Sequence, residues 1–230
     1  MKLGFDIISD LCLDPNESFN WENKATSLYC IIAGNVSNDT RTIAQTLLHL
    51  TRFYQGIVYI PGILEYKDVP LINERTRELS HICSGIKGVT FLYQHVVIVD
   101  GVAVVGSNGW YGFTGNLLEE TTADIKRTED LSYLYATIKK LQVHLDVKQI
   151  LIVSSSVPNN KLYFGEDPSF TKDQISLDNA LSADTQKKVK YWVFGTHEKI
   201  VDTNIDGINY LNNPYYKRRP YWAKRLEIQG

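Results

Sequence analysis

Residues that could carry chemistry cluster in short loops, each directly after an apolar, strand-like run. Carboxylates, thiols, imidazoles and hydroxyls in such loops are the side chains that transfer protons or ligate metals. Because ligands of open α/β sheets bind beyond the carboxyl ends of the strands, these loops predict the place of a site. They read Ser9-Asp10-Leu11-Cys12-Leu13-Asp14, Ala33-Gly34-Asn35-Val36-Ser37, Ile60-Pro61-Gly62-Ile63-Leu64-Glu65-Tyr66, Val153-Ser154-Ser155-Ser156-Val157-Pro158 and Phe194-Gly195-Thr196-His197-Glu198.

The elements that must position these loops alternate between strands and helices, which predicts an α/β fold with buried strands. We expect strands at Leu3–Ser9, Leu28–Ala33, Ile57–Ile60, Val89–Leu92, Val96–Val99, Val102–Gly106, Gln149–Ser154, Tyr191–Phe194, Ile200–Ile205, Ile208–Leu211 and Trp222–Ile228. Helical spacing of apolar residues predicts helices at Thr40–Gln55, Pro70–Cys83 and Leu131–Leu145. The Asp-Gly pairs at 100–101 and 206–207 predict two type I′ hairpins.

Composition sets limits on the setting of the protein. The net charge of −2 provides no global attraction to DNA or an anionic membrane, and no apolar run is long enough to span a bilayer. The start of the chain lacks the pattern of a signal peptide. Cys12, Cys30 and Cys83 are odd in number and scattered, which indicates reduced thiols and a cytoplasmic location. No composition shift divides the chain, so we expect residues 1–230 to form one domain.

The order of the loops resembles the signature loops of calcineurin-like metallophosphoesterases, which read roughly SDLHL, AGD, PGNHE, THHxP and GHTHE. Two further stretches extend the resemblance over nearly the whole chain, Val97–Val102 followed by Gly106–Trp110, and Gly207–Tyr215. The match is to the small single-domain type found in bacteria and phages. The resemblance implies a two-sheet α/β sandwich flanked by helices, with the site at one edge.

In that family the loops supply two Asp, one Asn and four His to a pair of divalent ions that orient a phosphate and generate hydroxide. In this chain Asp10 matches the first aspartate, and Glu65 matches the acid that follows the third loop's histidine. His197 matches the last histidine or nothing, because its loop is one residue shorter. The other five ligand positions carry residues of different chemistry, namely Cys12, Asn35, Ile63, Leu64 and Ser155, and Ser156 stands where the fourth loop has its next histidine.

The resemblance therefore predicts a degenerate site that lacks the dinuclear metal centre and has no assignable catalytic residue. Five lost ligands at about tenfold each would weaken metal binding by roughly 10⁵-fold. We expect a metallophosphoesterase homologue that is not an enzyme, a pseudoenzyme acting as a binding, structural or assembly module. A phage source, with the protein in the host cytoplasm or the virion, fits the small single-domain type.

Two alternatives stay open at this point. One is a residual metal-dependent phosphoesterase with an atypical site built from Asp10, Cys12, Asn35 and His197. The other is a sensor that binds a nucleotide or phosphate in the cleft without hydrolysing it.

A basic and aromatic stretch near the C-terminus is the candidate binding surface. Its residues are Tyr215, Tyr216, Lys217, Arg218, Arg219, Tyr221 and Trp222. Such a mixture stacks on nucleobases and pairs with phosphates, although a solvated loop before the last strand explains it equally simply. We expect a protein partner or self-association through exposed aromatics, with nucleic acid as the less supported partner. Changing the three bases to alanine is then expected to abolish partner binding without loss of the fold.

Overall fold

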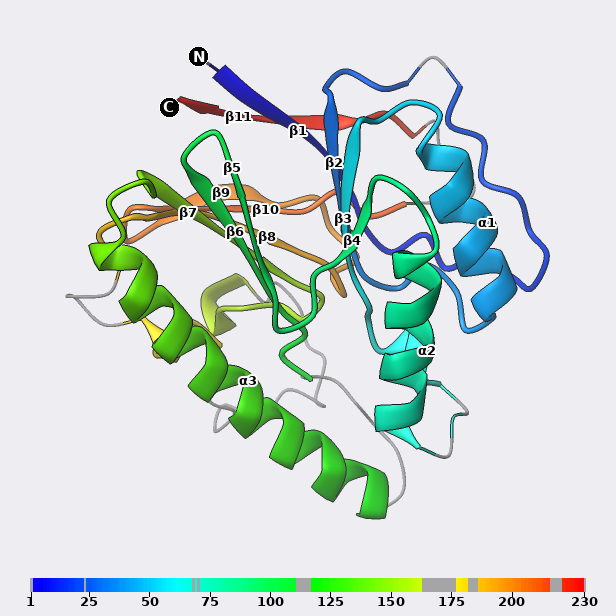
Figure 1. The fold of residues 1–230 in the computed structure, drawn as a ribbon. Coiled ribbons are helices and arrows are strands. Elements are labelled where there is room, and N and C mark those ends of the chain that lie inside the picture. Colours follow the sequence, from blue (N-terminus) through cyan, green and yellow to red (C-terminus); the bar gives the residue numbers. More distant parts are fainter. Residues whose placement is uncertain are drawn as a thin grey trace.

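The computed structural model describes residues 2–22, 24–67, 69, 71–110, 117–162, 177–181, 186–215 and 221–229. Their strands form two sheets that face each other across a buried apolar layer (Figure 1). Helices cover the outer faces of both sheets. The predicted two-sheet α/β sandwich flanked by helices is therefore confirmed.

The first sheet has the strand order β11-β1-β2-β3-β4. Four strands run parallel, and β11 lies antiparallel to β1 at one edge. This arrangement sends the carboxyl ends of β1, β2 and β3 to the same edge of the sheet. The strands are β1 (Lys2–Ile8), β2 (Tyr29–Ala33), β3 (Gly56–Ile60), β4 (Val89–Phe91) and β11 (Lys224–Gln229).

The second sheet has the order β5-β6-β7-β8-β10-β9, with four parallel inner strands and an antiparallel strand at each edge. Its strands are β5 (Val96–Val99), β6 (Val102–Ser107), β7 (Gln149–Ser154), β8 (Val189–Phe194), β9 (Asp202–Ile205) and β10 (Ile208–Leu211). At both predicted hairpins the Asp and the Gly have positive φ, 47° and 80° at Asp100-Gly101, and 51° and 85° at Asp206-Gly207. Two consecutive positive φ angles are those of a type I′ turn, so both hairpin predictions are confirmed.

Helices α1 (Thr40–Leu50) and α2 (Ile72–Ser84) lie on the outer face of the first sheet, and α3 (Leu117–Val143) lies on the outer face of the second (Figure 1). Three 3₁₀ turns complete the elements, η1 (Leu64–Tyr66), η2 (Asn160–Leu162) and η3 (Leu177–Ala180). The first helix ends five residues before the predicted Gln55, and α3 begins well before the predicted Leu131. In the described part of the chain, no helix has the length and apolar character that crossing a membrane requires.

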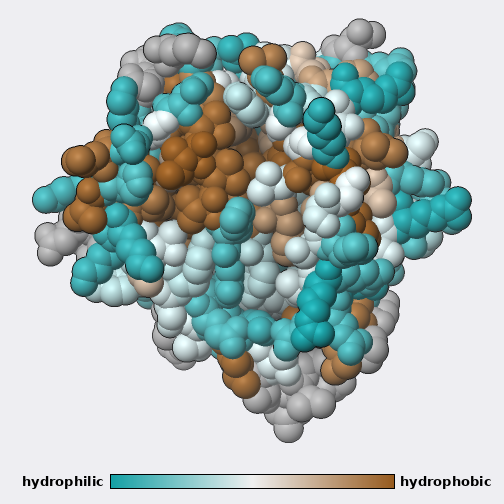
Figure 2. All heavy atoms as spheres, in the orientation of Figure 1, coloured by the Kyte–Doolittle hydropathy of each residue, from teal (hydrophilic) through white to brown (hydrophobic). Residues whose placement is uncertain are grey.

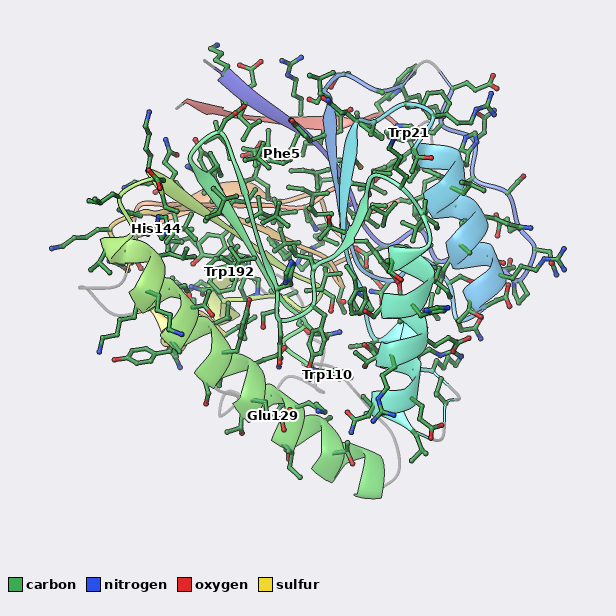
Figure 3. The ribbon with its side chains drawn as sticks, in the orientation of Figure 1. Phe5, Trp21, Trp110, Glu129, His144 and Trp192 are labelled. Atoms are coloured by element: carbon green, nitrogen blue, oxygen red, sulfur yellow. The ribbon has the colours of Figure 1, made fainter. Side chains whose placement is uncertain are left out.

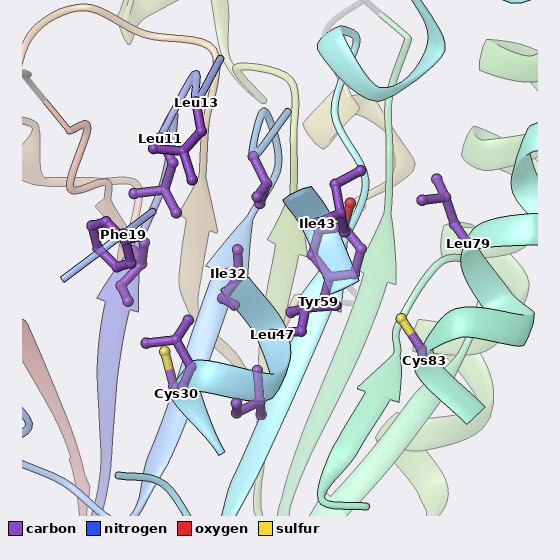
Figure 4. Close-up of a cluster of buried hydrophobic side chains, with 14 of the residues drawn as sticks. Leu11, Leu13, Phe19, Cys30, Ile32, Ile43, Leu47, Tyr59, Leu79 and Cys83 are labelled. Atoms are coloured by element: carbon purple, nitrogen blue, oxygen red, sulfur yellow. The ribbon is translucent and has the colours of Figure 1, made fainter. Parts of the chain in front are cut away.

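Three apolar clusters hold these layers together. One lies between the first sheet and helices α1 and α2 and includes Leu11, Ile32, Leu47 and Tyr59 (Figure 4). A second packs α3 against the outer face of the second sheet around Trp192. The third fills the space between the sheets, where Phe5 lies (Figure 3). No disulfide joins the three cysteines among the described residues, and two of them, Cys30 and Cys83, are buried.

The long segment between β1 and β2 is fixed to the first sheet by the fully buried Asp6. Its carboxylate accepts hydrogen bonds from Thr26 N at 2.7 Å and from the Tyr54 hydroxyl at 2.9 Å. The Tyr54 oxygen in turn accepts from Trp21 Nε1 at 2.6 Å. A buried carboxyl group that accepts from Thr26, Ser27 and Tyr54 is compatible with the core, and it holds the residues leading into β2 in place.

Helix α1 begins after an N-cap residue, Asp39. The Asp39 carboxylate accepts from Thr42 N at 2.8 Å and from the Thr42 hydroxyl at 2.7 Å, and these bonds lower the pKa of Asp39. We expect Asp39→Ala to lower the free energy of unfolding by about 1 kcal/mol in urea denaturation, whereas Asp39→Asn should keep most of the stabilisation by the cap. Because the pKa of Asp39 is lowered in the folded state, the difference in the free energy of unfolding between the wild type and Asp39→Ala should shrink as the pH falls below 4. Equal losses in the two variants would contradict a capping role.

Candidate functional site

The loops that the sequence singled out meet at one edge of the sandwich, beyond the carboxyl ends of β1, β2, β3, β7 and β8. Backbone hydrogen bonds join the first two loops, from Asp10 N to Gly34 O at 3.1 Å and from Cys12 N to Asn35 O at 2.8 Å. The last loop joins the fourth through Gly195 N to Ser154 O at 3.2 Å. Parallel strand order thus brings together residues up to 186 positions apart, as for Asp10 and Thr196, and we call this cluster the strand-end site.

Asn35 is the central connection of the strand-end site. Its amide nitrogen donates to Asp10 Oδ1 at 2.8 Å and to Thr196 Oγ1 at 3.0 Å. Its amide oxygen accepts from Leu64 N at 3.0 Å. One buried side chain therefore ties three loops together, because an amide offers both donors and an acceptor. An aspartate at this position would have no donor for Asp10.

Asp10 faces the centre of this cluster. Its Oδ1 accepts from Asn35 Nδ2 and from Thr196 N, the latter at 2.8 Å, while Oδ2 is buried without a hydrogen-bond partner among the described residues. Burial raises the pKa of Asp10 to about 6, although the hydrogen bonds from Asn35 and Thr196 act in the opposite direction. A carboxyl group with a pKa near neutrality can hold or release a proton under physiological conditions.

Glu65 organises the backbone of the second and third loops. Its fully buried carboxyl group accepts from Val36 N at 2.7 Å and Gly62 N at 2.8 Å, and also from Asn35 N at 3.1 Å and the Tyr59 hydroxyl at 3.0 Å. Burial raises the pKa of Glu65 to about 7, against the effect of the hydrogen bonds. Glu65 thus serves as a hydrogen-bond acceptor for the amides of these loops. The resemblance to the family motif did not predict this role.

A second amide, Asn108 after β6, links the third and fourth loops. Its Nδ2 donates to Pro61 O at 2.7 Å, and its Oδ1 accepts from the Ser155 hydroxyl at 3.0 Å. The loops approach so closely that a Cβ built on Gly34 would lie 2.7 Å from Ser155 Cβ, and one on Gly62 would lie 2.3 Å from Asn35 Oδ1. Glycine is required at both positions for this packing.

Asp130 of α3 supports the Asn108 turn from behind. It is fully buried and accepts from Gly109 N at 2.8 Å and the Ser107 hydroxyl at 3.0 Å. Burial raises the pKa of Asp130. Neither Asn108 nor Asp130 is among the site residues predicted from the sequence. A signal existed for Asp130, since it precedes Leu134 and Ile138 at helical spacing and so places an acid on an apolar helix face.

The backbone of the strand-end site adopts a conformation that most side chains avoid. Asp10, Cys12, Asn35 and Thr196 all have positive φ, between 46° and 57°. Residues held in this region cost of order 1–3 kcal/mol each and persist where the surrounding structure imposes them, often at functional sites. The surrounding structure thus holds these loops in a strained backbone geometry.

His197 and Cys12 do not join Asp10 in a ligand set. His197 Nε2 lies 3.1 Å from Leu162 O, and Nδ1 lies 2.8 Å from Lys199 O, so the ring is engaged with backbone groups. Among the described residues, no group of three or more His, Cys, Asp and Glu is placed to hold a metal ion. Donor N–H groups of Asn35 point at Asp10 where a bridging carboxylate would be needed, and the described residues therefore do not fit a pair of bridged ions.

The predicted binding surface divides into two parts. Tyr216, Lys217, Arg218 and Arg219 lie outside the described residues. The expectation that the neighbouring aromatics are exposed is wrong for Tyr221, which is buried against Phe19 and Trp21 and donates its hydroxyl to Asn213 O. Tyr215 is half-buried and packs edge-on against Phe19, whereas Trp222 is 65% exposed. Tyr221 therefore belongs to the core, whereas Trp222 stays a candidate contact.

The two sheets, their strand order and the loops at one edge define the class, a phosphoesterase-type two-sheet fold. The solved structure of phosphopantetheinyl hydrolase (PptH) from Mycobacterium tuberculosis is similar, with a TM-score of 0.64 over 98% of this chain and 96% of that one, at 17% identity. A putative 5′-nucleotidase from Staphylococcus aureus, in complex with alpha-ketoglutarate, gives a TM-score of 0.54 at 10% identity, and this chain spans 51% of it. No family model and no curated protein matches the sequence.

These likenesses overturn one prediction. The chain was expected not to be an enzyme, but the two similar structures described above are named as a phosphopantetheinyl hydrolase and a putative 5′-nucleotidase. The expectation rested on residues that do not match the family's metal ligands. Such a mismatch argues against a two-metal mechanism, but it does not argue against hydrolysis by another mechanism. Nothing in the fold or in the likenesses supports a phage origin or an assembly role.

Proposed function

We propose that this protein is a phosphoester hydrolase that acts on a phosphorylated small molecule at the strand-end site. In this proposal, hydrogen bonds among Asp10, Asn35 and Thr196 hold the loops of the site in place. In metallophosphoesterases, a pair of metal ions holds them. The observation that carries the proposal is the Asn35 amide, which contacts three loops at 2.8–3.0 Å. The similar fold of two hydrolases, named for a phosphopantetheinyl group and for nucleotides, supports the class of substrate.

Asp10 is the residue to which the proposal gives the proton transfer. Its pKa of about 6 lets it exchange a proton near neutral pH, and Oδ1 is fixed by two donors while Oδ2 has none among the described residues. A carboxyl group fixed through one oxygen can transfer a proton through the other without losing its orientation. The proposed role is to protonate the leaving oxygen of the ester or to accept a proton from the attacking water.

Negative charge on the phosphate requires donors, and the proposal assigns them to the bases Lys217, Arg218 and Arg219. These residues follow Tyr215, whose backbone nitrogen donates to Ser9 O at 3.0 Å, directly beside Asp10. Guanidinium groups suit phosphate because they donate parallel hydrogen bonds. In the proposal, the bases of the candidate binding surface therefore bind the phosphate of the substrate.

The test is turnover of p-nitrophenyl phosphate and bis(p-nitrophenyl) phosphate by protein treated with EDTA. We expect slow hydrolysis that the chelator does not abolish, and a loss of about 10²–10⁴-fold in kcat in Asp10→Asn with little change in KM. Asp146→Asn, an exposed loop residue, is the matched control and should keep its rate. The proposal fails if the protein gives no turnover, or if activity returns only after addition of Mn²⁺ or Zn²⁺.

A further inference from the structure

A cavity of about 430 Å³ lies at the opposite end of the first sheet from the strand-end site. It is lined where β1 and β2 begin, by Lys2, Gly4 and the residues that lead into Tyr29, and it extends to the turn between β5 and β6 at Asp100. Its volume is within the range of about 300–1,000 Å³ that small-molecule sites occupy. The cavity shares no residue with the strand-end site.

One side of this cavity is apolar. Leu28 is 65% exposed, and Tyr29 and Phe53 line the wall beside it. Tyr29 also packs against the apolar layer between the sheets. Figure 2 shows further apolar side chains gathered over the β5–β6 hairpin, which borders the cavity only at its Asp100 turn. An exposed leucine beside open aromatic walls is a surface that an apolar ligand body would cover.

The other side carries positive charge and an unused hydroxyl. Arg225 lies over Gly4, where a built Cβ would be 3.6 Å from its guanidinium, and it donates to Thr26 O at 2.7 Å. Lys2 lines the same rim and is largely exposed. The Ser27 hydroxyl is buried and has no hydrogen-bond partner among the described residues. A buried hydroxyl without a partner costs free energy, and a ligand oxygen would remove that cost.

We propose that this cavity binds a small organic monocarboxylate with an apolar body. The carboxylate would accept from Arg225, Lys2 and Ser27, and the body would lie on Leu28, Tyr29 and Phe53. Glu227 already forms ion pairs with Lys2 and Arg225, each at 3.1 Å. The ligand carboxylate would compete with Glu227 for these two side chains and therefore bind with modest affinity. Asp100, on the rim formed by the hairpin turn, disfavours a second anionic group and so restricts the ligand to one negative charge.

The test uses decanoate and decanol, which share an apolar chain and differ in the head group, below the concentration at which either forms micelles. We expect saturable binding of decanoate by calorimetry and weaker binding of decanol. Arg225→Gln should weaken decanoate binding by about tenfold, because it removes charge-assisted hydrogen bonds. Lys190→Gln, an exposed substitution on β8, is the control and should bind as the wild type does.

Ser27→Val separates ligand recognition from stability. It removes the unpartnered hydroxyl, so the melting temperature should hold or rise while decanoate binding weakens. This variant stays informative even if Arg225→Gln destabilises the fold through the lost bond to Thr26. Equal affinity for decanoate and decanol, unchanged binding in Ser27→Val, or absence of saturable decanoate binding would each overturn the proposal.

Discussion

Asn35→Asp is expected to lower the free energy of unfolding by about 3–5 kcal/mol at pH 8. The substitution changes only an amide to a carboxylate, yet it replaces the donor that lies 2.8 Å from Asp10 Oδ1 and 3.0 Å from Thr196 Oγ1. Two carboxylate oxygens would then face each other in a buried place, and Asp10 would lose one of its two hydrogen bonds. Backbone strain cannot explain the loss, because both asparagine and aspartate tolerate the φ of 57° found at this position.

The pH dependence identifies the cause of that loss. Two carboxylates at such a distance share a proton, so the pKa of the pair rises in the folded state. A raised folded pKa means that the stability is present at low pH and is lost as the pH rises. Urea denaturation of Asn35→Asp should therefore approach the wild type near pH 5 and fall away toward pH 8. The exposed Asn20→Asp is the matched control, and a similar pH-independent loss in both variants would contradict the electrostatic explanation.

The second large effect is expected at Glu65. Glu65→Ala leaves three backbone N–H groups and one hydroxyl, all now bonded to this carboxyl group, without their acceptor in a fully buried place. Each unsatisfied buried donor costs about 1–3 kcal/mol, so the variant should lose at least about 3 kcal/mol and disorder the loops that carry Asn35 and Gly62. Loss of amide protection there, measured by hydrogen exchange, would accompany the loss of stability. A variant as stable as Glu22→Ala, which changes an exposed acid, would contradict the role.

Glu65 also predicts how the stability of the wild type depends on pH. Burial raises its pKa from 4.5 to about 7, so the folded state holds a proton in this interval that the unfolded state has released. Stability is then full below pH 4.5 and falls as the pH rises toward 7, by about 3 kcal/mol in total from this group. Asp10 contributes in the same direction at lower pH, between 3.8 and about 6. The decline between pH 6 and 7 should be absent in Glu65→Gln.

Much of the fold was predictable because its signals are local. The Asp-Gly turns at 100–101 and 206–207 and the N-cap at Asp39 depend on residues that are neighbours in the sequence. The first half of α3 was missed because its apolar residues are too sparse to mark one face, whereas Leu134, Ile138 and Leu141 all contact the second sheet. Helix α1 stops at Leu50 because residues 51–53 form a turn that leads into β3, and apolar spacing alone does not show such a turn.

The candidate site was predictable in position but not in chemistry. Loop order located Asp10, Asn35 and Ser155 at one edge, since parallel strands carry their carboxyl ends together. The partners of these residues depend on contacts across as many as 186 sequence positions, as for Thr196 N and Asp10, and no local pattern encodes them. The resemblance treats Asn35 only as a ligand position of different chemistry, but its amide also supplies a donor, and that donor ties the loops together.

Metal analysis of the purified protein, together with its melting temperature before and after treatment with EDTA, tests most directly whether protein hydrogen bonds hold the strand-end loops. We predict that zinc, iron and manganese are present far below one ion per chain and that the chelator leaves the melting temperature unchanged. A tightly held pair of ions in each chain, with a melting temperature that falls when they are removed, would contradict the account built on Asn35.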